Sequence, residues 1–279
     1  MRVIFSGGLG NQLFQYALYL ALKEKGVKVK RELSLYSYVK MHNGFEIDKI
    51  FNVEDKNNSR KTVSKINSAF LRIIIKTNPL GLLLKDTNNF VALNSIINSN
   101  YKWIYGYWQS EKYFSDCEGS IRQNFTFVNI DAENKKIAKT ISNSNSVSLH
   151  IRRGDYVNND IYDHICDERY YKKAIAYILD KIEMPIFYVF SNDIEWAKKF
   201  LEQFPIQKVF MTINQAQKNY QDMYLMSCCK HNIIANSSFS WWGAWLNNNK
   251  SKIVIAPSIW MNNTETPDII PETWIKLPK

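Results

Sequence analysis

The second half of the chain alternates short apolar segments, rich in β-branched and aromatic residues, with longer segments of helical periodicity. This alternation constrains the fold most, because it predicts a parallel sheet whose strands are joined by helices packed on both faces. We expect strands at 147–151, 186–190, 209–211, 232–235 and 253–255, and helices at 170–181, 194–203, 220–229 and 239–247. Ligands of such sheets bind beyond the carboxyl ends of the strands, so binding residues are expected in the loops that follow them.

The N-terminal segment begins a similar unit. Residues 3–5 predict a strand, which a glycine-rich turn at 7–10, a helix from 11 to about 24 and a strand at 27–29 follow. Glycines let the backbone approach a ligand, and a helix N-terminus favours negative charge. The candidate ligand-binding residues here are Gly8, Gly10, Asn11 and Gln12. A tight turn of purely structural importance explains this segment equally well, since neither a dinucleotide fingerprint nor a P-loop is complete.

A polar stretch at 129–146, with a helical pattern near its middle, predicts a helical linker between two halves. We therefore expect an N-terminal domain at 1–130 and a C-terminal domain at 131–279. In the first domain, residues 56–85 carry seven Lys and Arg residues, no acid, and apolar residues at helical spacing. This pattern indicates a basic amphipathic helix, which is either a surface helix of an inserted subregion or a contact with an anionic membrane.

Composition narrows the classes of partner and site. The net charge of +10 favours polyanions, which include nucleic acid, anionic lipid and a pyrophosphate substrate, without choosing among them. The four cysteines form no CxxC pair and the chain has only four histidines, so neither a disulfide framework nor a zinc site is predicted. The N-terminus lacks the pattern of a signal peptide and no long apolar run occurs, so we expect a cytoplasmic protein whose membrane contact, if any, is peripheral.

The loop after the strand at 147–151 carries the strongest single motif. Side chains alternate along a strand, so His150 and Arg152 share one face. The guanidinium group is a planar fork that binds phosphate oxygens in pairs. Arg152 and Arg153, at a strand end and followed by Gly154, therefore predict a phosphate site.

Two further strand-end loops carry polar residues. After the strand at 186–190 come Ser191, Asn192 and Asp193, where a carboxylate either accepts N–H groups of a guanine edge or only caps the next helix. After the strand at 232–235, hydroxyl and backbone N–H groups at a helix start predict an anion cradle. Its candidate residues are Asn236, Ser237, Ser238, Phe239 and Ser240.

Taken together, these motifs resemble the bacterial α-1,2-fucosyltransferases of glycosyltransferase family 11. The matching stretches are 7–17, 150–156, 190–193, 236–245 and 270–275, in the order of the family. The resemblance implies a GT-B fold, in which two Rossmann-like domains face a central cleft. It implies GDP-β-L-fucose as the donor, held mainly by the C-terminal half without a required metal or other cofactor, and a galactoside acceptor facing the N-terminal half. Nucleic acid is not among the partners it implies.

The resemblance also implies individual roles. Arg152 would hold the β-phosphate, Asp193 the guanine, and the Ser238–Ser240 segment further phosphate oxygens. The base that deprotonates the acceptor hydroxyl stays open among Asp155, Asp160 and His150. A nucleotide-binding Rossmann oxidoreductase and a non-catalytic sugar- or nucleotide-binding module are the alternatives in other functional classes.

Overall fold

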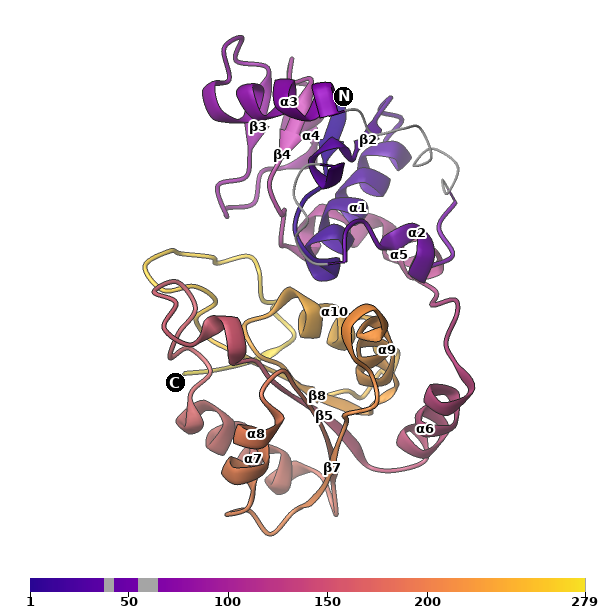
Figure 1. Ribbon diagram of the computed structural model, residues 1–279, viewed down its shortest axis with the longest axis vertical. Helices are drawn as coiled ribbons and strands as arrows, with labels where there is room; N and C mark the ends of the chain where they lie inside the picture. Colours follow the sequence, from indigo (N-terminus) through magenta and orange to yellow (C-terminus); the bar gives the residue numbers. More distant parts are fainter. Residues whose placement is uncertain (38–42, 55–64, 279) are drawn as a thin grey trace. The chain divides into compact units, whose positions relative to one another are not determined.

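The computed structural model describes residues 1–37, 43–54 and 65–278, and the chain forms two compact units. Unit 1 comprises Met1–Asn129 together with Pro267–Ile269, and unit 2 comprises Ile130–Thr266 together with Ile270–Lys279. Each unit is built around one parallel sheet. Figure 1 shows the elements of both units along the chain.

Among the described residues, the sheet of unit 1 has four parallel strands in the order β2-β1-β4-β3. Val3 in the centre of β1 lies opposite Arg31 of β2 and Ile104 of β4. The strands are β1 (Arg2–Ile4), β2 (Lys30–Glu32), β3 (Leu83–Lys85) and β4 (Trp103–Tyr105). The helices are α1 (Leu9–Glu24), α2 (Ile47–Ile50), α3 (Lys65–Thr77), α4 (Leu93–Ile97) and α5 (Glu118–Asn124), with 3-10 helices at Ser34–Ser37, Glu111–Tyr113 and Ser115–Cys117.

Helix α1 is buried on nearly all sides, as its apolar sequence predicts: 13 of its 16 residues are buried. It begins at Leu9, two residues before the expected start, so Gly10 lies inside the helix and the prediction of a turn over 7–10 is wrong in its second half. Of the glycines in this segment only Gly7 has a positive φ, at 80°. The turn therefore depends on Gly7, the first residue of the predicted turn.

The predicted strand at 27–29 is wrong, and the end of α1 explains why. Gly26 ends the helix with φ at 80°, and Val27 N–H donates to the Leu22 carbonyl at 3.0 Å. This is the hydrogen-bond pattern of a Schellman motif, which uses the backbone that a strand would need. Val29 N–H then donates to the Val27 carbonyl, so pairing with β1 starts only at Lys30.

The expected basic helix is observed in part. Residues 55–64 lie outside the described residues, and within 65–85 the chain forms α3 and then β3. Leu71 on the inner side of α3 is buried against Ile4 and Leu83. Within the described residues, no helix has both the length and the apolar character needed to cross a bilayer.

The sheet of unit 2 has six parallel strands in the order β10-β9-β8-β5-β6-β7. The strands are β5 (Ser146–Ile151), β6 (Ile186–Ser191), β7 (Gln207–Phe210), β8 (His231–Ile233), β9 (Val254–Pro257) and β10 (Ile275–Leu277). The helices are α6 (Ala132–Ser142), α7 (Glu168–Lys181), α8 (Ile194–Leu201), α9 (Tyr220–Cys228) and α10 (Ser238–Leu246), with 3-10 helices at Gly154–Tyr156 and Ala216–Lys218. The predicted doubly wound parallel sheet is confirmed.

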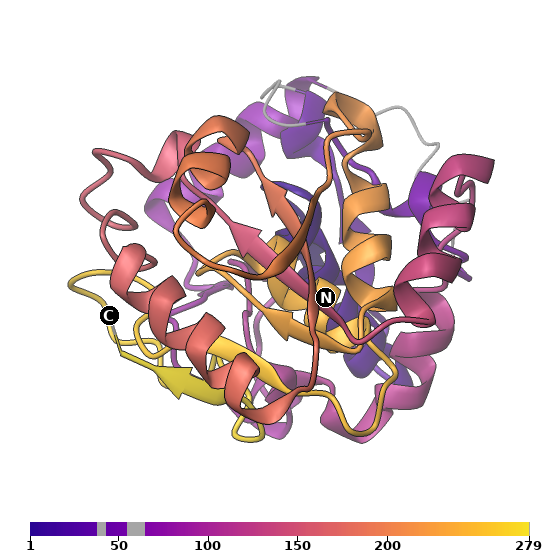
Figure 2. The ribbon, with the colours of Figure 1, turned by 90° about the horizontal axis from the view of Figure 1, so that it is seen from below.

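Alternating side chains of this sheet fill two cores. Phe187 and Val189 of β6 pack with α7 and α8 in one core, whereas Tyr188 and Phe190 pack with α6 and α9 in the other. Figures 1 and 2 show these helix pairs on opposite faces of the sheet. The chain runs from β5 outward to β7 and then returns to β8 on the other side of β5, so the strand order reverses between β5 and β8.

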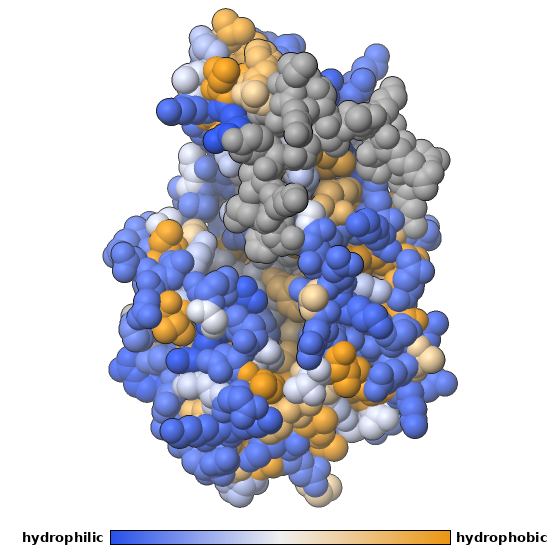
Figure 3. Space-filling model, viewed as in Figure 1, coloured by the Kyte–Doolittle hydropathy of each residue, from blue (hydrophilic) through white to orange (hydrophobic). Residues whose placement is uncertain are grey.

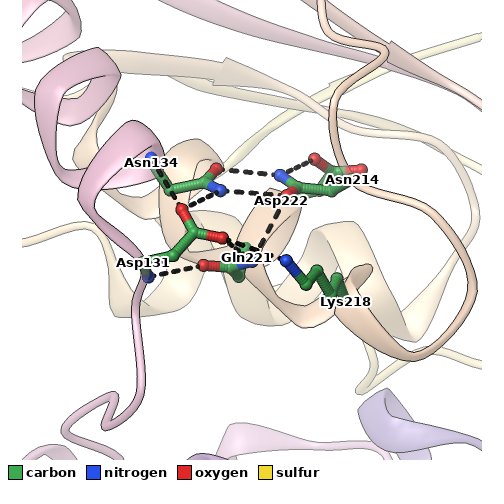
Figure 4. Close-up of polar contacts among 6 residues, drawn as sticks. All are labelled: Asp131, Asn134, Asn214, Lys218, Gln221 and Asp222. Atoms are coloured by element: carbon green, nitrogen blue, oxygen red, sulfur yellow. Dashed lines mark hydrogen bonds and ion pairs between the residues drawn. The ribbon is translucent and has the colours of Figure 1, made fainter.

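The polar stretch expected to link the two halves forms α6, which packs within unit 2. A hydrogen-bond network fixes its first turn (Figure 4). Asp131 accepts from Asn134 N–H at 3.0 Å and from Gln221 Nε2 at 3.0 Å. Asn134 and Asn214 exchange amide hydrogen bonds at 2.9 and 3.0 Å, and Asn214 also donates to Asp222 at 2.8 Å. The network thereby ties α6 to the loop after β7 and to α9.

Candidate functional site

The carboxyl edge of the unit 2 sheet brings together the three strand-end loops that the sequence singled out. Strand β5 pairs with β6 on one side and with β8 on the other, so the loops after these strands are neighbours. The strand order reverses between β5 and β8, which is where open parallel sheets bind ligands. A cavity of about 370 Å³ opens there, and its walls include Arg152, Arg153, Tyr156, Trp196 and Asn236.

Arg152 follows the last residue of β5 and is partly exposed at this edge. One of its terminal nitrogens lies 2.8 Å from a carboxylate oxygen of Asp155, and its guanidinium carbon lies 5.4 Å from the centre of the Tyr156 ring. These contacts fix one side of the guanidinium group. Its Nε is buried and has no hydrogen-bond partner within the described residues. Arg152 is thus oriented by the protein and retains a donor for a ligand.

Arg153 takes a different position. Its guanidinium carbon lies 4.2 Å from the centre of the Trp196 ring, and its Nε lies 3.4 Å from an Asp193 carboxylate oxygen. The Trp196 ring also stacks on Phe200, with an interplanar angle of 11°. Arg153 is therefore part of the packing around α8. Its expected contact with the donor stays a prediction.

Asn192 joins the loop after β6 to the loop after β5. Its Oδ1 accepts from the backbone N–H of Arg153 at 2.9 Å, and its Nδ2 is directed at Asp155 at 3.5 Å. A Cβ on Gly154 would overlap Asn192 Nδ2, so a larger residue at this position would displace the Asn192 side chain. Asn192 was expected among the donor ligands, and the structure shows that it positions the arginine loop.

Asp193 and Ser191 complete the loop after β6. Asp193 Oδ1 accepts from Trp196 N–H at 3.2 Å, which caps α8, and Asp193 N–H donates to Ser191 Oγ at 3.0 Å. The predicted capping role of Asp193 is confirmed. A carboxylate has about four acceptor positions, so it keeps capacity for a guanine edge, and that role stays a prediction.

His150 lies at the end of β5 and is only 5% exposed. Burial, followed by the positive charge of Arg152, lowers the pKa of His150 to about 3. Its Nδ1 has no hydrogen-bond partner within the described residues, and its backbone carbonyl accepts from the Tyr171 hydroxyl at 3.0 Å. An imidazole that remains neutral and binds protons this weakly supports the strand end better than it serves as a base.

The loop after β8 supplies a third buried atom without a partner. Asn236 donates through Nδ2 to the Trp260 carbonyl at 3.1 Å, but its buried Oδ1 has no partner within the described residues. Its backbone carbonyl accepts from the Tyr156 hydroxyl at 3.2 Å. An unpaired buried polar atom costs about 1–3 kcal/mol. Such atoms on His150 in β5, on Arg152 after it and on Asn236 after β8 therefore make this edge of the sheet the candidate site for a polar ligand.

The start of α10 is open to an anion. Ser237 is the N-cap residue, and its side chain makes no capping hydrogen bond, so it does not occupy the N–H groups of the first turn. Ser237 and Ser240 are buried, with Ser240 Oγ donating to the Ser237 carbonyl at 3.3 Å, whereas Ser238 and Phe239 are partly exposed. The Phe239 ring lies 6.2 Å from the His150 ring, which places this turn beside β5.

Asp160, the remaining candidate base, lies in the loop after the 3-10 helix at Gly154–Tyr156. It is exposed, and its backbone carbonyl accepts from Asn262 Nδ2 at 3.1 Å. Its carboxylate makes no hydrogen bond or ion pair within the described residues, and it does not line the cavity. Asp163, three positions further along, does line the cavity, but its carboxylate accepts from two backbone N–H groups.

The remaining candidates lie in unit 1, at the start of α1. Gly8 is the N-cap residue, and Gly10 lies within the helix. Asn11 accepts from Gln109 Nε2 at 2.7 Å. Gln12 is fully buried and donates to the carbonyls of Gly7 and Gly44, so both its N–H donors are used within the protein. Gln12 therefore holds the turn together, and no donor remains on it for a ligand.

Sequence reasoning did not assign a role to two aromatic residues of the site or to one carboxylate that holds a loop in unit 1. Tyr156 stacks on Tyr162 at 4.7 Å in the cavity wall, and Trp196 lies under Arg153. In unit 1, Asp86 accepts from the backbone N–H groups of Tyr107 and Trp108 at 3.1 and 2.7 Å. Trp196 could have been found from its position in the first turn of a helix that follows a strand. Nothing in the sequence pairs Asp86 with a loop about twenty residues away.

Comparison with known proteins identifies relatives over the whole chain. A family model described as "Glycosyl transferase family 11" matches residues 3–277. An α-1,2-colitosyltransferase of Escherichia coli is 38% identical over 98% of this chain and 97% of its own length. The O-antigen biosynthesis glycosyltransferase WbnK of Escherichia coli is 32% identical over 99% of this chain and 100% of its own. The solved structure of fucosyltransferase NodZ from Bradyrhizobium, 14% identical, superposes with a TM-score of 0.50 over 87% of this chain and 92% of that one, and shows a shared fold.

Proposed function

Since this chain belongs to glycosyltransferase family 11, we propose that it transfers L-fucose from GDP-β-L-fucose to the 2-hydroxyl group of a terminal galactose. The acceptor galactose would end an oligosaccharide or a surface polysaccharide. One observation supports the donor site above all others: near the edge where the strand order reverses, Arg152, His150 and Asn236 each carry a buried polar atom without a partner among the described residues. A nucleotide with a pyrophosphate and a sugar has the polar groups to satisfy them.

The proposed reaction inverts the anomeric carbon. The acceptor oxygen forms a bond to that carbon while the bond to the β-phosphate oxygen breaks, and GDP leaves with the electron pair. Negative charge grows on the β-phosphate as this happens. Preoriented donors stabilise such charge best, and Arg152, fixed by Asp155 and Tyr156, is one of them. The N–H groups of the first turn of α10 are the others.

The acceptor hydroxyl must lose its proton to a base. Among the three candidates, we assign this role to Asp160, because its exposed carboxylate is unpaired within the described residues. Asp155 is held by Arg152 and orients it, and burial keeps His150 from binding a proton near neutral pH. Replacing Asp160 with asparagine should lower kcat while leaving GDP affinity unchanged. Loss of GDP affinity, with kcat retained, would reject this assignment.

A separate observation supports GDP-colitose as an alternative sugar donor. The relative that is 38% identical is an α-1,2-colitosyltransferase, and colitose is L-fucose without its 3-hydroxyl group. Turnover of GDP-fucose and GDP-colitose by the purified chain, with a β-galactoside acceptor, compares the two donors directly. A higher kcat/KM for GDP-colitose would replace fucose with colitose in the proposal. Turnover of neither donor with any galactoside would reject it.

The phosphate role of Arg152 has a matched control in the chain. Arg152 pairs with Asp155 at 2.8 Å with its side chain 31% exposed, and Arg122 pairs with Glu118 at 2.7 Å with its side chain 26% exposed. Arg152→Ala should abolish transfer, and Arg152→Lys should nearly do so, because a point charge replaces a fork. Arg122→Ala should leave kcat unchanged. Normal turnover by Arg152→Ala would overturn the site assignment.

A further inference from the structure

An apolar surface lies on the outer side of α3 in unit 1. Phe70 is 60% exposed and Ile73 is 58% exposed, and Leu80, in the turn after the helix, is 77% exposed. Single exposed apolar residues are ordinary, but three large ones within eleven positions form a patch. Figure 3 shows hydrophobic residues gathered at the top of the view, where Figure 1 places α3 and the turn that follows it.

These side chains do not hold α3 in place. The helix is fixed by its opposite side, where Leu71 is only 2% exposed and Ile74 and Ile75 pack against the same core. Positions 70 and 73 are three apart and share one face, which points away from that core. The patch can therefore contact a partner without disturbing the fold.

Basic residues accompany the patch. Arg72 and Lys76 are exposed on the outer side of α3, and Lys85 is exposed at the end of β3. The sequence from residue 56 to residue 85 contains seven Lys and Arg residues and no acidic residue. A partner of this surface therefore carries negative charge beside an apolar layer.

We propose that the α3 surface, which consists of Phe70, Ile73, Leu80, Lys76 and Lys85, docks on an anionic lipid bilayer. A helix of 13 residues is about 20 Å long, too short to cross a membrane. With its axis in the plane of the bilayer, it places apolar side chains among the acyl chains and lysines among the headgroups. This inference concerns binding alone and does not depend on the identity of the donor or acceptor.

Sedimentation of the full chain with vesicles tests the proposal. Vesicles of phosphatidylglycerol should bind the protein at least about tenfold more tightly than vesicles of phosphatidylcholine, and added salt should weaken that binding. Combined replacement of Phe70, Ile73 and Leu80 by serine should lower the affinity at least about tenfold. Lys76→Glu with Lys85→Glu should do the same.

Two exposed apolar residues of unit 2 provide the control. Met184 is 77% exposed, which matches Leu80, and Val209 is 43% exposed. Their replacement by serine removes exposed apolar area without touching the α3 surface and should leave vesicle binding unchanged. Unchanged circular dichroism and melting temperature would show that the α3 variants fold.

Three outcomes would overturn the proposal. The first is equal binding to neutral and anionic vesicles. The second is vesicle binding by the triple serine variant as strong as that of the original chain. The third is a dimer of the original chain in sedimentation velocity that the triple variant no longer forms while it still binds vesicles, which would assign the surface to a second copy of the chain.

Discussion

Replacing Gly154 with alanine tests whether the loop after β5 must be held in one position for transfer to occur. An added Cβ would overlap Asn192 Nδ2 and lie 3.2 Å from Asn192 Cγ. Because nonbonded heavy atoms prefer separations of about 3.5–4 Å, the loop and the amide must move apart by about 1 Å. The φ angle of Gly154 is not positive, so alanine adds this overlap without backbone strain.

The displacement should affect activity far more than stability. It breaks the hydrogen bond from Arg153 N–H to Asn192 Oδ1 and shifts Arg152, the residue before it. A misplacement of about 1 Å at a reacting centre costs about 100-fold in rate. That factor corresponds to about 2.7 kcal/mol of transition-state stabilisation. The free energy of unfolding should fall by only about 1 kcal/mol, the contribution of one hydrogen bond in an exposed loop.

Acceptor-dependent GDP release is the assay, and Gly119→Ala is the control. Gly119 lies in α5 of unit 1, and a Cβ there meets nothing within 4 Å, so its replacement should leave kcat/KM unchanged. Asn192→Ala should be impaired as well, because it removes the same hydrogen bond. The kcat/KM of the double variant should be no lower than that of the less active single variant, since both changes disrupt the same contact. Near-normal kcat/KM in Gly154→Ala, or additive losses in the double variant, would refute the reasoning.

Three further predictions concern ionisation and capping. Burial raises the pKa of Asp222 to about 7, although a hydrogen bond from Asn214 opposes the shift. Between about pH 4 and pH 7 the folded protein therefore keeps a proton on Asp222 that the unfolded chain has lost. The free energy of unfolding should fall as the pH rises through this range. Asp222→Asn should abolish this pH-dependent loss of stability, which amounts to up to about 4 kcal/mol. The same decline of the melting temperature with pH in the original protein and in the variant would contradict the prediction. His150 should stay neutral from about pH 5 to 8 because its pKa is lowered to about 3, and a shift of its imidazole nitrogen resonances in that range would exclude this. Asp167 caps α7 by accepting from the Arg169 and Tyr170 N–H groups, both at 3.0 Å, so Asp167→Ala should lower the free energy of unfolding in urea by about 1 kcal/mol and Asp167→Asn by less.

The elements of unit 2 could be predicted closely because their sequence and their burial agree. Strands such as β5 and β6 are buried over most or all of their length, and the helices between them are apolar on one side, so two different periods alternate along the chain. The predicted strand at 147–151 differs from β5 by one residue. In unit 2, the local hydrophobic period of each segment therefore predicts the strand or helix that the segment forms in the sheet.

Unit 1 could be predicted less well. Strands β3 and β4 have three residues each, which is too short for any alternation to be visible. The strand predicted at 27–29 was displaced because Gly26 starts a Schellman motif whose hydrogen bonds extend past the helix. A capping motif of this kind depends on backbone geometry at one residue, and apolar residues at 27 and 29 do not reveal it.

The location of the candidate site could be predicted, but its internal contacts could not. The carboxyl ends of parallel strands meet at one edge, so Arg152, Asn192 and Asn236 were expected together. The hydrogen bonds within the site join residues that are about 40 or 80 positions apart in the sequence. Asn192 binds the Arg153 backbone, and Tyr156 binds the Asn236 backbone. Sequence order carries no information about these pairs.

The two adjacent arginines show what this difference means for function. In the sequence, Arg152 and Arg153 have the same chemistry, and both were expected to bind phosphate. Because successive side chains diverge at a strand end, Arg153 is placed over Trp196 and against Asp193, whereas Arg152 keeps a buried Nε without a partner within the described residues. An arginine held by a ring and a carboxylate stabilises its surroundings, and one with an unsatisfied buried donor gains most from an anion. The Nε without a partner within the described residues, more than the arginine motif, therefore supports the proposal that Arg152 binds the donor.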